Sequence, residues 1–129
     1  MTTLFLLFNH QITPDQERDA RTTLKIKTII TMPAEIQDIW SQVPPGLDKI
    51  SGILEPVKSW LASQASPGDY VLIQGDFGAC FIMVNLAFEL GLVPVYATTC
   101  REVTEELEPD GSLKLTRRFK HQRFRIYGD

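Results

Sequence analysis

Four short apolar segments recur along the chain, separated by longer stretches of mixed polarity. Segment 4–8 is a continuous apolar run, which is typical of a strand covered on both faces of a sheet. The other three are short and rich in β-branched or aromatic residues, so each also predicts a strand. They are 26–31, 70–74 and 93–97.

The stretches between these strands carry helix signals. Thr13-Pro14-Asp15-Gln16 reads as a capping box with proline at the first helical position, and it predicts a helix that runs to about Leu24. Apolar residues at steps of three and four then predict three more helices. These are a short helix around 36–40, a helix over 47–61 kinked at Pro56, and a helix over 77–90 ended by Gly91.

Strands that alternate with helices at this spacing predict a parallel sheet with helices on both faces. Beyond residue 97 the pattern alternates like a hairpin around 109–112. We therefore expect a Rossmann-like three-layer α/β sandwich, mostly parallel, with a C-terminal antiparallel hairpin. The whole chain, 1–129, should form this single domain.

Composition narrows the functional classes. The 129 residues are 43% hydrophobic with a net charge of -3, which is ordinary for a soluble globular domain and argues against a protein that coats long nucleic acid. The longest apolar run is too short to span a bilayer and lacks the basic flank of a signal peptide, so we expect a cytoplasmic protein. Two cysteines and two histidines lack the spacing of a metal site, and we expect neither a metal nor another cofactor.

Basic residues gather near the C-terminus. Six of the 13 lysines and arginines lie in the last sixteen positions, directly after an acidic stretch at 102–110. Two antiparallel strands whose charges pair across the ladder would explain 114–118. They explain 121–125 less well. In that segment, alternation predicts that one strand face carries His121, Arg123, Arg125 and Tyr127. This face could bind a ligand, form a salt bridge or contact another subunit.

Ligands of open parallel sheets bind beyond the carboxyl ends of the strands, which makes the residues there the candidates. After the first strand these include His10, a proton carrier near neutral pH or an inert loop residue, and Asn9, which could also only shape the turn. After the fourth strand, threonine hydroxyls could bind phosphate or satisfy the end of the strand. The candidates there are Thr98, Thr99 and Arg101.

The third strand is followed by Gln74-Gly75-Asp76-Phe77-Gly78. Two glycines at the turn into a helix let a ligand approach backbone amides. Asp76 could hold a ribose hydroxyl or an adenine amino group, or it could simply cap the helix. Phe77 could stack on a base or belong to the core. If ligand passes close to Gly78, Gly78→Val should block binding.

Together these segments resemble a family of short CRISPR-associated ring nucleases related to the CARF sensor domains of type III systems. The resemblance spans nearly the whole chain and is most specific in the Gln-Gly-Asp-Phe-Gly block at 74–78. The segments that carry it are 4–10, 69–78, 96–99 and 120–125. The chain departs from the larger CARF proteins because it has no appended effector domain. It also has Cys100 after Thr98-Thr99, where a cation would suit phosphate.

The resemblance implies a CARF-like homodimer that holds cyclic oligoadenylate across its two-fold axis and cleaves it without metal to products with 2′,3′-cyclic phosphate ends. It implies ligand contacts from 74–78, Thr98, Thr99 and Arg101. The expected catalytic residues are Asn9, His10, His121 and Arg123, with His10 and His121 as rival proton carriers. A module that sequesters the same messenger without turnover, and a Rossmann-like subunit with no nucleotide site, remain alternatives.

Overall fold

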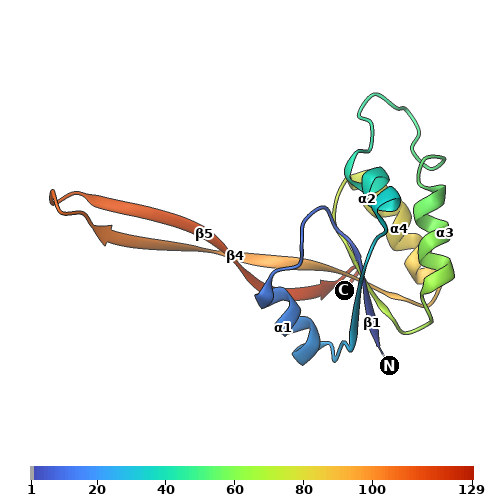
Figure 1. Cartoon of the computed structure of the whole chain (residues 1–129), viewed down its shortest axis with the longest axis horizontal. Coiled ribbons are helices and arrows are strands. Elements are labelled where there is room, and N and C mark those ends of the chain that lie inside the picture. The colour runs from blue at the N-terminus through green and yellow to red at the C-terminus, as the bar shows by residue number, and fades with distance from the viewer. Residues whose placement is uncertain (1) are drawn as a thin grey trace.

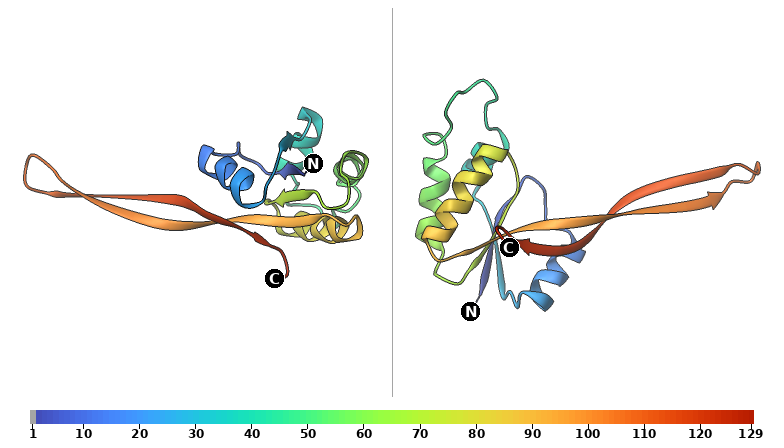
Figure 2. Two further views of the ribbon diagram at one scale, coloured as in Figure 1. Left: turned by 90° about the horizontal axis from the view of Figure 1, so that it is seen from below. Right: turned by 180° about the vertical axis from the view of Figure 1, so that it is seen from behind.

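The computed structural model describes residues 2–129 and contains one five-stranded sheet of order β2-β1-β3-β4-β5 (Figure 1). The neighbouring pairs among β1 to β4 are parallel, whereas β4 and β5 are antiparallel, as the sequence predicts. The sheet is strongly twisted (Figure 2). Its strands are β1 (Thr3–Leu7), β2 (Thr28–Thr31), β3 (Tyr70–Ile73), β4 (Val93–Leu107) and β5 (Leu113–Ile126).

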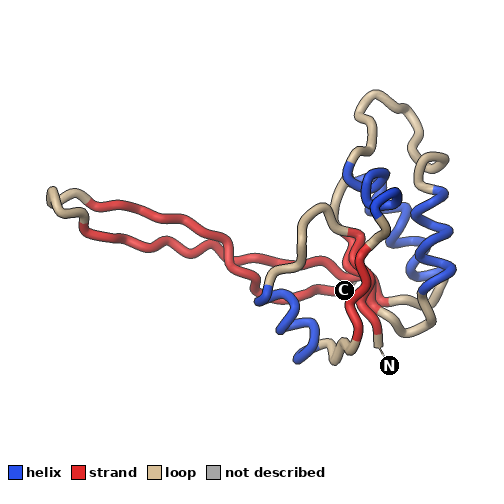
Figure 3. Tube along the Cα trace, viewed as in Figure 1, coloured by secondary structure: helices blue, strands red, loops and turns tan. Residues whose placement is uncertain are grey.

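Helices cover both faces of this sheet (Figure 3). Strand β1 shows why, because its successive side chains point to opposite faces and all are apolar. Leu4 and Leu6 pack with Ala20 of helix α1 (Pro14–Thr23), while Phe5 and Leu7 belong to the larger core cluster. That larger cluster is built with helices α2 (Ala34–Ser41), α3 (Glu55–Gln64) and α4 (Phe77–Glu89). The mixed α/β architecture is therefore confirmed.

The predicted capping box is present at the start of α1. The Thr13 hydroxyl accepts a hydrogen bond from the Gln16 backbone N–H at 3.2 Å, and the Gln16 side-chain oxygen accepts one from the Thr13 N–H at 3.0 Å. Two backbone donors that the first helical turn leaves unpaired are thus satisfied. This local chemistry fixes the start of α1, whose residue Asp19 contacts His121 of β5.

The predicted helix over 47–61 is wrong in its first half. Residues 44–54 form turns, and α3 begins only at Glu55, so Pro56 lies in its first turn and kinks nothing. A proline there costs no hydrogen bond, because the first N–H groups of a helix have no partner within it. Val57 and Leu61 are buried on α3 as the periodicity indicates, whereas Leu47 is 45% exposed.

The fourth strand does not end at 97 as predicted. Instead, β4 continues to Leu107 and stays paired with β5 along its length, with a bulge between Thr98 and Thr99. From Thr99 to Leu107 the ladder continues without a further shift in register and pairs the backbone groups of every second residue, so no turn is needed until the predicted tip around 109–112. We call residues 100–120 the arm. It projects far from the rest of the chain, which we call the body (Figures 1 and 2).

Candidate functional site

The order of the strands places a crevice between β1 and β3. From β1 the chain moves outward to β2 and then returns past β1 to β3, and ligands of open α/β sheets bind at such reversals, beyond the carboxyl ends of the strands. A cavity of about 190 Å³ lies at this point. Its lining residues are Phe8, Asn9, His10, Gln74 and Gly75, so the ends of β1 and β3 meet there as expected.

Two larger cavities adjoin this crevice and share its lining residues. One, of about 600 Å³, includes Asn9 and His10 and extends toward β2 and α2. The other, of about 540 Å³, includes Gln74 and Gly75 and extends toward α4 and the start of β4. We call the three cavities together the strand-end groove, which runs along the carboxyl edge of the sheet.

Four of the eight residues that line the cavity on the α4 side are aromatic. Tyr96 and Tyr127 lie with ring centroids 4.8 Å apart, and Phe77 is 94% exposed at the start of α4. Burial, and then the nearby Cys80 and Tyr96, raise the pKa of Tyr127 to about 12. Burial likewise raises the pKa of the Cys80 thiol. Both groups are therefore neutral at pH 7, and this cavity offers flat, uncharged surfaces.

A cation lies beside these rings. Arg125 donates a hydrogen bond from Nη1 to the Tyr96 hydroxyl at 3.1 Å, and its Cζ is 5.6 Å from the centroid of the Tyr96 ring. A guanidinium held in this way can bind phosphate in bidentate fashion. The arrangement therefore combines a stacking surface for a planar ring with a positive group for an anion.

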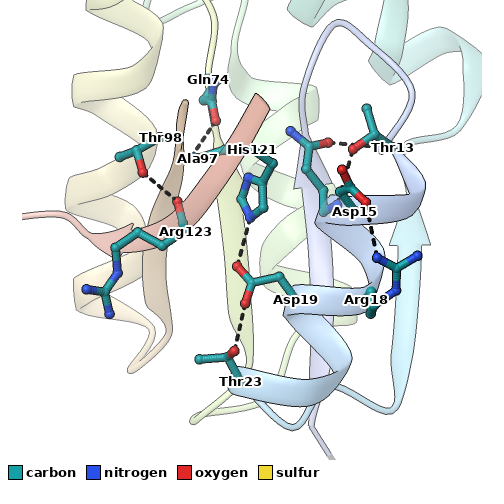
Figure 4. A network of polar contacts seen from close by, with 11 residues as sticks. Thr13, Asp15, Arg18, Asp19, Thr23, Gln74, Ala97, Thr98, His121 and Arg123 are labelled. Atoms are coloured by element: carbon teal, nitrogen blue, oxygen red, sulfur yellow. Dashed lines mark hydrogen bonds and ion pairs between the residues drawn. The ribbon is translucent and has the colours of Figure 1, made fainter. Parts of the chain in front are cut away.

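Gln74 connects the two halves of the groove. Its side-chain oxygen accepts a hydrogen bond from the Ala97 N–H at 2.7 Å (Figure 4), and its backbone oxygen accepts one from Trp40 Nε1 at 3.0 Å. These bonds fix both the side chain and the end of β3. Because the Ala97 N–H fixes the Gln74 side-chain oxygen, the amide NH₂ is the donor group that this residue can offer a ligand.

The glycines and Asp76 of the 74–78 block serve the fold. A Cβ on Gly75 would lie 3.0 Å from Trp40 Nε1, and one on Gly78 would lie 3.2 Å from Ile50 Cδ1. The missing side chain of Gly78 thus makes room for the Ile50 side chain and does not open onto the groove. Gly78→Val therefore tests packing and not the approach of a ligand. The Asp76 carboxylate accepts the Ala79 N–H at 3.0 Å, so it caps α4.

The two histidines lie in separate places. His10 lines the strand-end groove, is exposed, and makes an edge contact with Phe8 at 5.4 Å between ring centroids. His121 lies against α1 with its side chain only 6% exposed, and its Nε2 is 2.7 Å from Asp19 Oδ2 (Figure 4). Asp19 in turn accepts a hydrogen bond from the Thr23 hydroxyl at 2.6 Å. The structure does not bring His121 to the groove.

A general base needs both an oriented ring and an accessible ring nitrogen, and each of the two histidines has only one of these. Asp19 orients His121, but the other ring nitrogen, Nδ1, is buried and has no hydrogen-bond partner among residues 2–129. His10 is accessible, but no carboxylate or carbonyl of the described residues orients its ring. Burial alone would raise the pKa of Asp19. Hydrogen bonds from Thr23 and His121 and the charges of His121 and Arg123 nevertheless hold it below its ordinary value.

The bulge in the β4–β5 pair changes which residues share a face. Thr98 pairs with Arg123 and Thr99 with His121, so the strict alternation along 121–127 is interrupted. As a result His121 reaches Asp19 of α1, whereas Arg125 reaches Tyr96 on the α4 side. The prediction that all four residues of this set share one face is wrong, because alternation in the sequence cannot reveal an extra residue in the ladder.

The remaining candidates lie within strands. Thr98 donates its hydroxyl hydrogen to the Arg123 backbone oxygen at 2.9 Å, which satisfies the bulge, and Thr99 is exposed in the middle of β4. Arg101 lies on the arm. A ligand role for these residues stays a prediction. Tyr96 and Phe81 were missed as groove residues in the sequence analysis, although Phe81 lies one helical turn after Phe77 on α4 and that aromatic spacing was a usable signal.

The fold and groove define a mixed α/β domain with a ligand-sized site at the carboxyl edge of its sheet. By sequence, the chain belongs to the family described as the uncharacterized protein MJ1673 family, whose profile matches residues 2–125. A relative from Methanocaldococcus jannaschii, described as uncharacterized protein MJ1673, is 48% identical over 127 residues, which is 98% of each chain. No solved structure matches the chain. Among residues 2–129, no helix has the length and apolar character needed to cross a membrane.

Proposed function

We propose that this chain is a ring nuclease of the type III CRISPR response. It would bind cyclic oligoadenylate, with cyclic tetra-adenylate as the expected ring, and open it to linear products with 2′,3′-cyclic phosphate ends. The observation that carries the proposal is the union, in one groove, of an aromatic cavity with the loop that holds Asn9 and His10. The sequence resemblance of segments 4–10 and 69–78 supplies the substrate class.

The groove has the chemistry that a nucleotide requires. Unstacked bases bind proteins by stacking on aromatic side chains and by hydrogen bonds to their edges. Phe77, Phe81 and Tyr96 supply such rings, and the Gln74 amide can donate to an acceptor nitrogen of adenine. Arg125, held over Tyr96, can neutralise a phosphate next to the stacked base.

The reaction needs no water as nucleophile. A ribose 2′-oxygen attacks the adjacent phosphorus, the bond from phosphorus to the 5′-oxygen breaks, and a proton passes from the 2′-hydroxyl to the leaving 5′-oxygen through solvent or a side chain. Alignment of these atoms and neutralisation of the phosphate supply much of such a rate. His10 is the histidine of the groove and would add about 10²-fold or more as a proton carrier.

A ring of repeated nucleotides fits a two-fold site. One groove lies open at the edge of the sheet and would contact half of the ring, so we propose a homodimer in which two such edges face each other across the ligand. Each copy would then contribute one aromatic cavity and one His10 loop.

One observation favours a second function. Catalytic histidines are commonly oriented by a hydrogen-bonded partner, and the described residues provide none for His10. A groove that binds the messenger without turning it over would show the same geometry. Sequestration of cyclic oligoadenylate is therefore the alternative.

Incubation of the full chain with cyclic tetra-adenylate in EDTA, followed by chromatography, tests both functions. We expect linear products with cyclic phosphate ends, a loss of about 10²-fold in single-turnover rate for His10→Ala with affinity unchanged, and weaker binding for Arg125→Ala. Arg18→Ala, on the exposed face of α1, is the control and should change neither. Ligand that is retained intact would support sequestration. Absence of binding would contradict both functions.

A further inference from the structure

The two faces of the arm differ in chemistry. Residues paired across the two strands share a face, and successive pairs alternate between faces. On one face the pairs are Cys100 with Lys120, Glu102 with Arg118, Thr104 with Thr116, and Glu106 with Lys114. On the other they are Arg101 with Phe119, Val103 with Arg117, Glu105 with Leu115, and Leu107 with Leu113. We call these the polar face and the apolar face of the arm.

The polar face satisfies itself. Glu102 forms ion pairs with both Arg118, at 3.5 Å, and Lys120, at 3.7 Å. Glu106 lies opposite Lys114, which carries the opposite charge. Such cross-strand pairing is the role that the charge pattern of 114–118 suggests. Nothing on this face calls for a partner, and it suits contact with water.

The apolar face is uncovered. Every large apolar side chain of the arm lies on it, and each is more than half exposed: Val103, Leu107, Leu113, Leu115 and Phe119. The arm projects away from the helices, so the body does not shield this face (Figure 2). A two-stranded ribbon is marginally stable alone in water, and a contiguous apolar patch usually marks an interaction surface.

The charges on the apolar face identify what covers it. The two pairs nearest the body contain Arg101 and Arg117, and the two pairs nearest the tip contain Glu105. Suppose that the same face of a second copy packs on this face with its arm pointing in the opposite direction. The half of each arm nearest its own body then meets the half of the other arm nearest the tip. The pair of Val103 and Arg117 then meets the pair of Glu105 and Leu115, which brings an arginine close to a glutamate, and the pair of Arg101 and Phe119 meets the two leucines nearest the tip. Stacking in the same direction would instead place like charges together.

We propose that the apolar face of the arm packs against the same face of a second copy of this chain, antiparallel and around a two-fold axis at the middle of the arm. In this arrangement β4 faces β4 and β5 faces β5, so Arg117 of β5 lies diagonally across from Glu105 of the partner subunit, within reach of its long side chain, twice in each pair of arms. This is an isologous contact, in which one surface is complementary to itself. It is a different contact from the pairing of strand-end edges across a ligand, because an axis at the middle of the arm leaves the two bodies at opposite ends of the paired arms. It rests on the arm alone and does not require the ligand.

Charge reversal tests the contact between copies. Glu105→Arg and Arg117→Glu should each place like charges across the two-fold axis and raise the dimer dissociation constant by about tenfold or more. An equimolar mixture of the two variants should restore a dimer, because one chain then offers two arginines and the other two glutamates. Sedimentation velocity measures association, and native mass spectrometry of one isotope-labelled variant identifies the mixed pair.

Reversal on the polar face provides the matched control. Glu106→Arg and Lys114→Glu change charge on the opposite face, one residue from Glu105 and three residues from Arg117 along their strands, and should leave association as in the parent chain. Two results would overturn the proposal. A parent chain that stays monomeric at high concentration would show that something other than a second copy covers the face. Single variants that stay fully dimeric would show that the copies meet elsewhere, for example at the strand-end groove, which would leave the proposed function standing.

Discussion

The body and the arm are built from the same sheet but are stabilised in different ways. In the body, each strand between two layers of helices contributes side chains to a core on both faces, and Leu4, Phe5, Leu6 and Leu7 are all at most 4% exposed. On the arm, residues 109–120 are all exposed, and the ladder with its cross-strand pairs is all that orders them. The body folds by burying its own surface, whereas the arm presents surface that only another molecule can bury.

The largest test of this contrast is a truncation in each region. Trp40 is 1% exposed in the main core and donates a hydrogen bond to the Gln74 oxygen, so Trp40→Ala should lower the free energy of unfolding by about 3–5 kcal/mol. Leu113→Ala removes an apolar side chain that is 62% exposed on the arm and should change it by no more than about 0.5 kcal/mol. Urea denaturation at a protein concentration too low for association measures both. Equal losses would show that the arm folds as part of the body.

The same contrast explains what the sequence could predict. The body gave correct strands and helices because burial leaves a pattern in the sequence. In β1 it is a continuous apolar run, Leu4 to Leu7, covered on both faces, and in α3 it is the helical spacing of Val57 and Leu61. The capping box was readable because it depends on residues three apart. The length of β4 was not, since no local signal marks where a strand that keeps its partner should stop. Residues 44–54 also lacked a local signal that marks where the helix begins. Proline is compatible with the first turn of a helix and disfavoured in its interior, so Pro56 alone does not show which of the two applies.

The site was predictable at the level of strand ends and no further. That Asn9 and His10 meet Gln74 and Gly75 follows from parallel strands ending at one edge. That His121 is bound to Asp19, 102 positions away, follows from a bulge and a helix docking that leave no trace in either segment. The aromatic cavity likewise depends on the contact between Tyr96 of β4 and Tyr127, which directly follows β5.

The contact between His121 and Asp19 lies at the junction of the two regions, where it fixes the base of the arm to α1. Asp19→Asn should lower the free energy of unfolding at pH 7 by about 1.5–3 kcal/mol, the range for a hydrogen bond to a charged group. The folded pKa of Asp19 lies below its ordinary value of 3.8, so this stability is present above that pH and is lost as the pH falls below it. The gap between parent and variant, measured by urea denaturation across pH, should therefore narrow below about pH 4.

Asp15→Asn is the control for that prediction. It removes an ion pair with Arg18 on the same helix, but the two side chains are 53% and 73% exposed. The expected change is less than about 1 kcal/mol. If the two aspartates cost the same, the contact of α1 with the arm base contributes nothing beyond an ordinary surface charge.

A close contact within the body provides a smaller effect. Gly75→Ala would place a Cβ 3.0 Å from Trp40 Nε1, and a packed indole ring can give way only by disturbing its neighbours. The free energy of unfolding should fall by about 1–3 kcal/mol. Gly46→Ala, with nothing within 4 Å of the new Cβ, should leave it unchanged or raise it by up to about 1 kcal/mol. Thermal unfolding of both variants measures these changes. If Gly75→Ala is as stable as Gly46→Ala, the packing around Trp40 is looser than this close contact indicates.

The smallest expected effect concerns Tyr127, where β5 returns to the body. Its hydroxyl donates to the Ile73 oxygen at 2.6 Å, so Tyr127→Phe should cost about 0.5–1.5 kcal/mol at neutral pH. Tyr70→Phe, on the other face of β3, is the matched substitution for comparison.

The pH dependence separates this hydrogen bond from general packing. The pKa of Tyr127 rises from 10.0 to about 12 in the folded chain, so the hydroxyl stays protonated there after an unfolded chain has begun to ionise. The stability that Tyr127 contributes is present in full below pH 10 and is lost between pH 10 and about 12. The difference in unfolding free energy between parent and Tyr127→Phe should therefore shrink across that interval, while tyrosinate absorbance of the folded parent shows one tyrosine ionising late. A difference that stays constant with pH would mean that the hydroxyl ionises equally in both states and that β5 is held to β3 by apolar contacts of the ring.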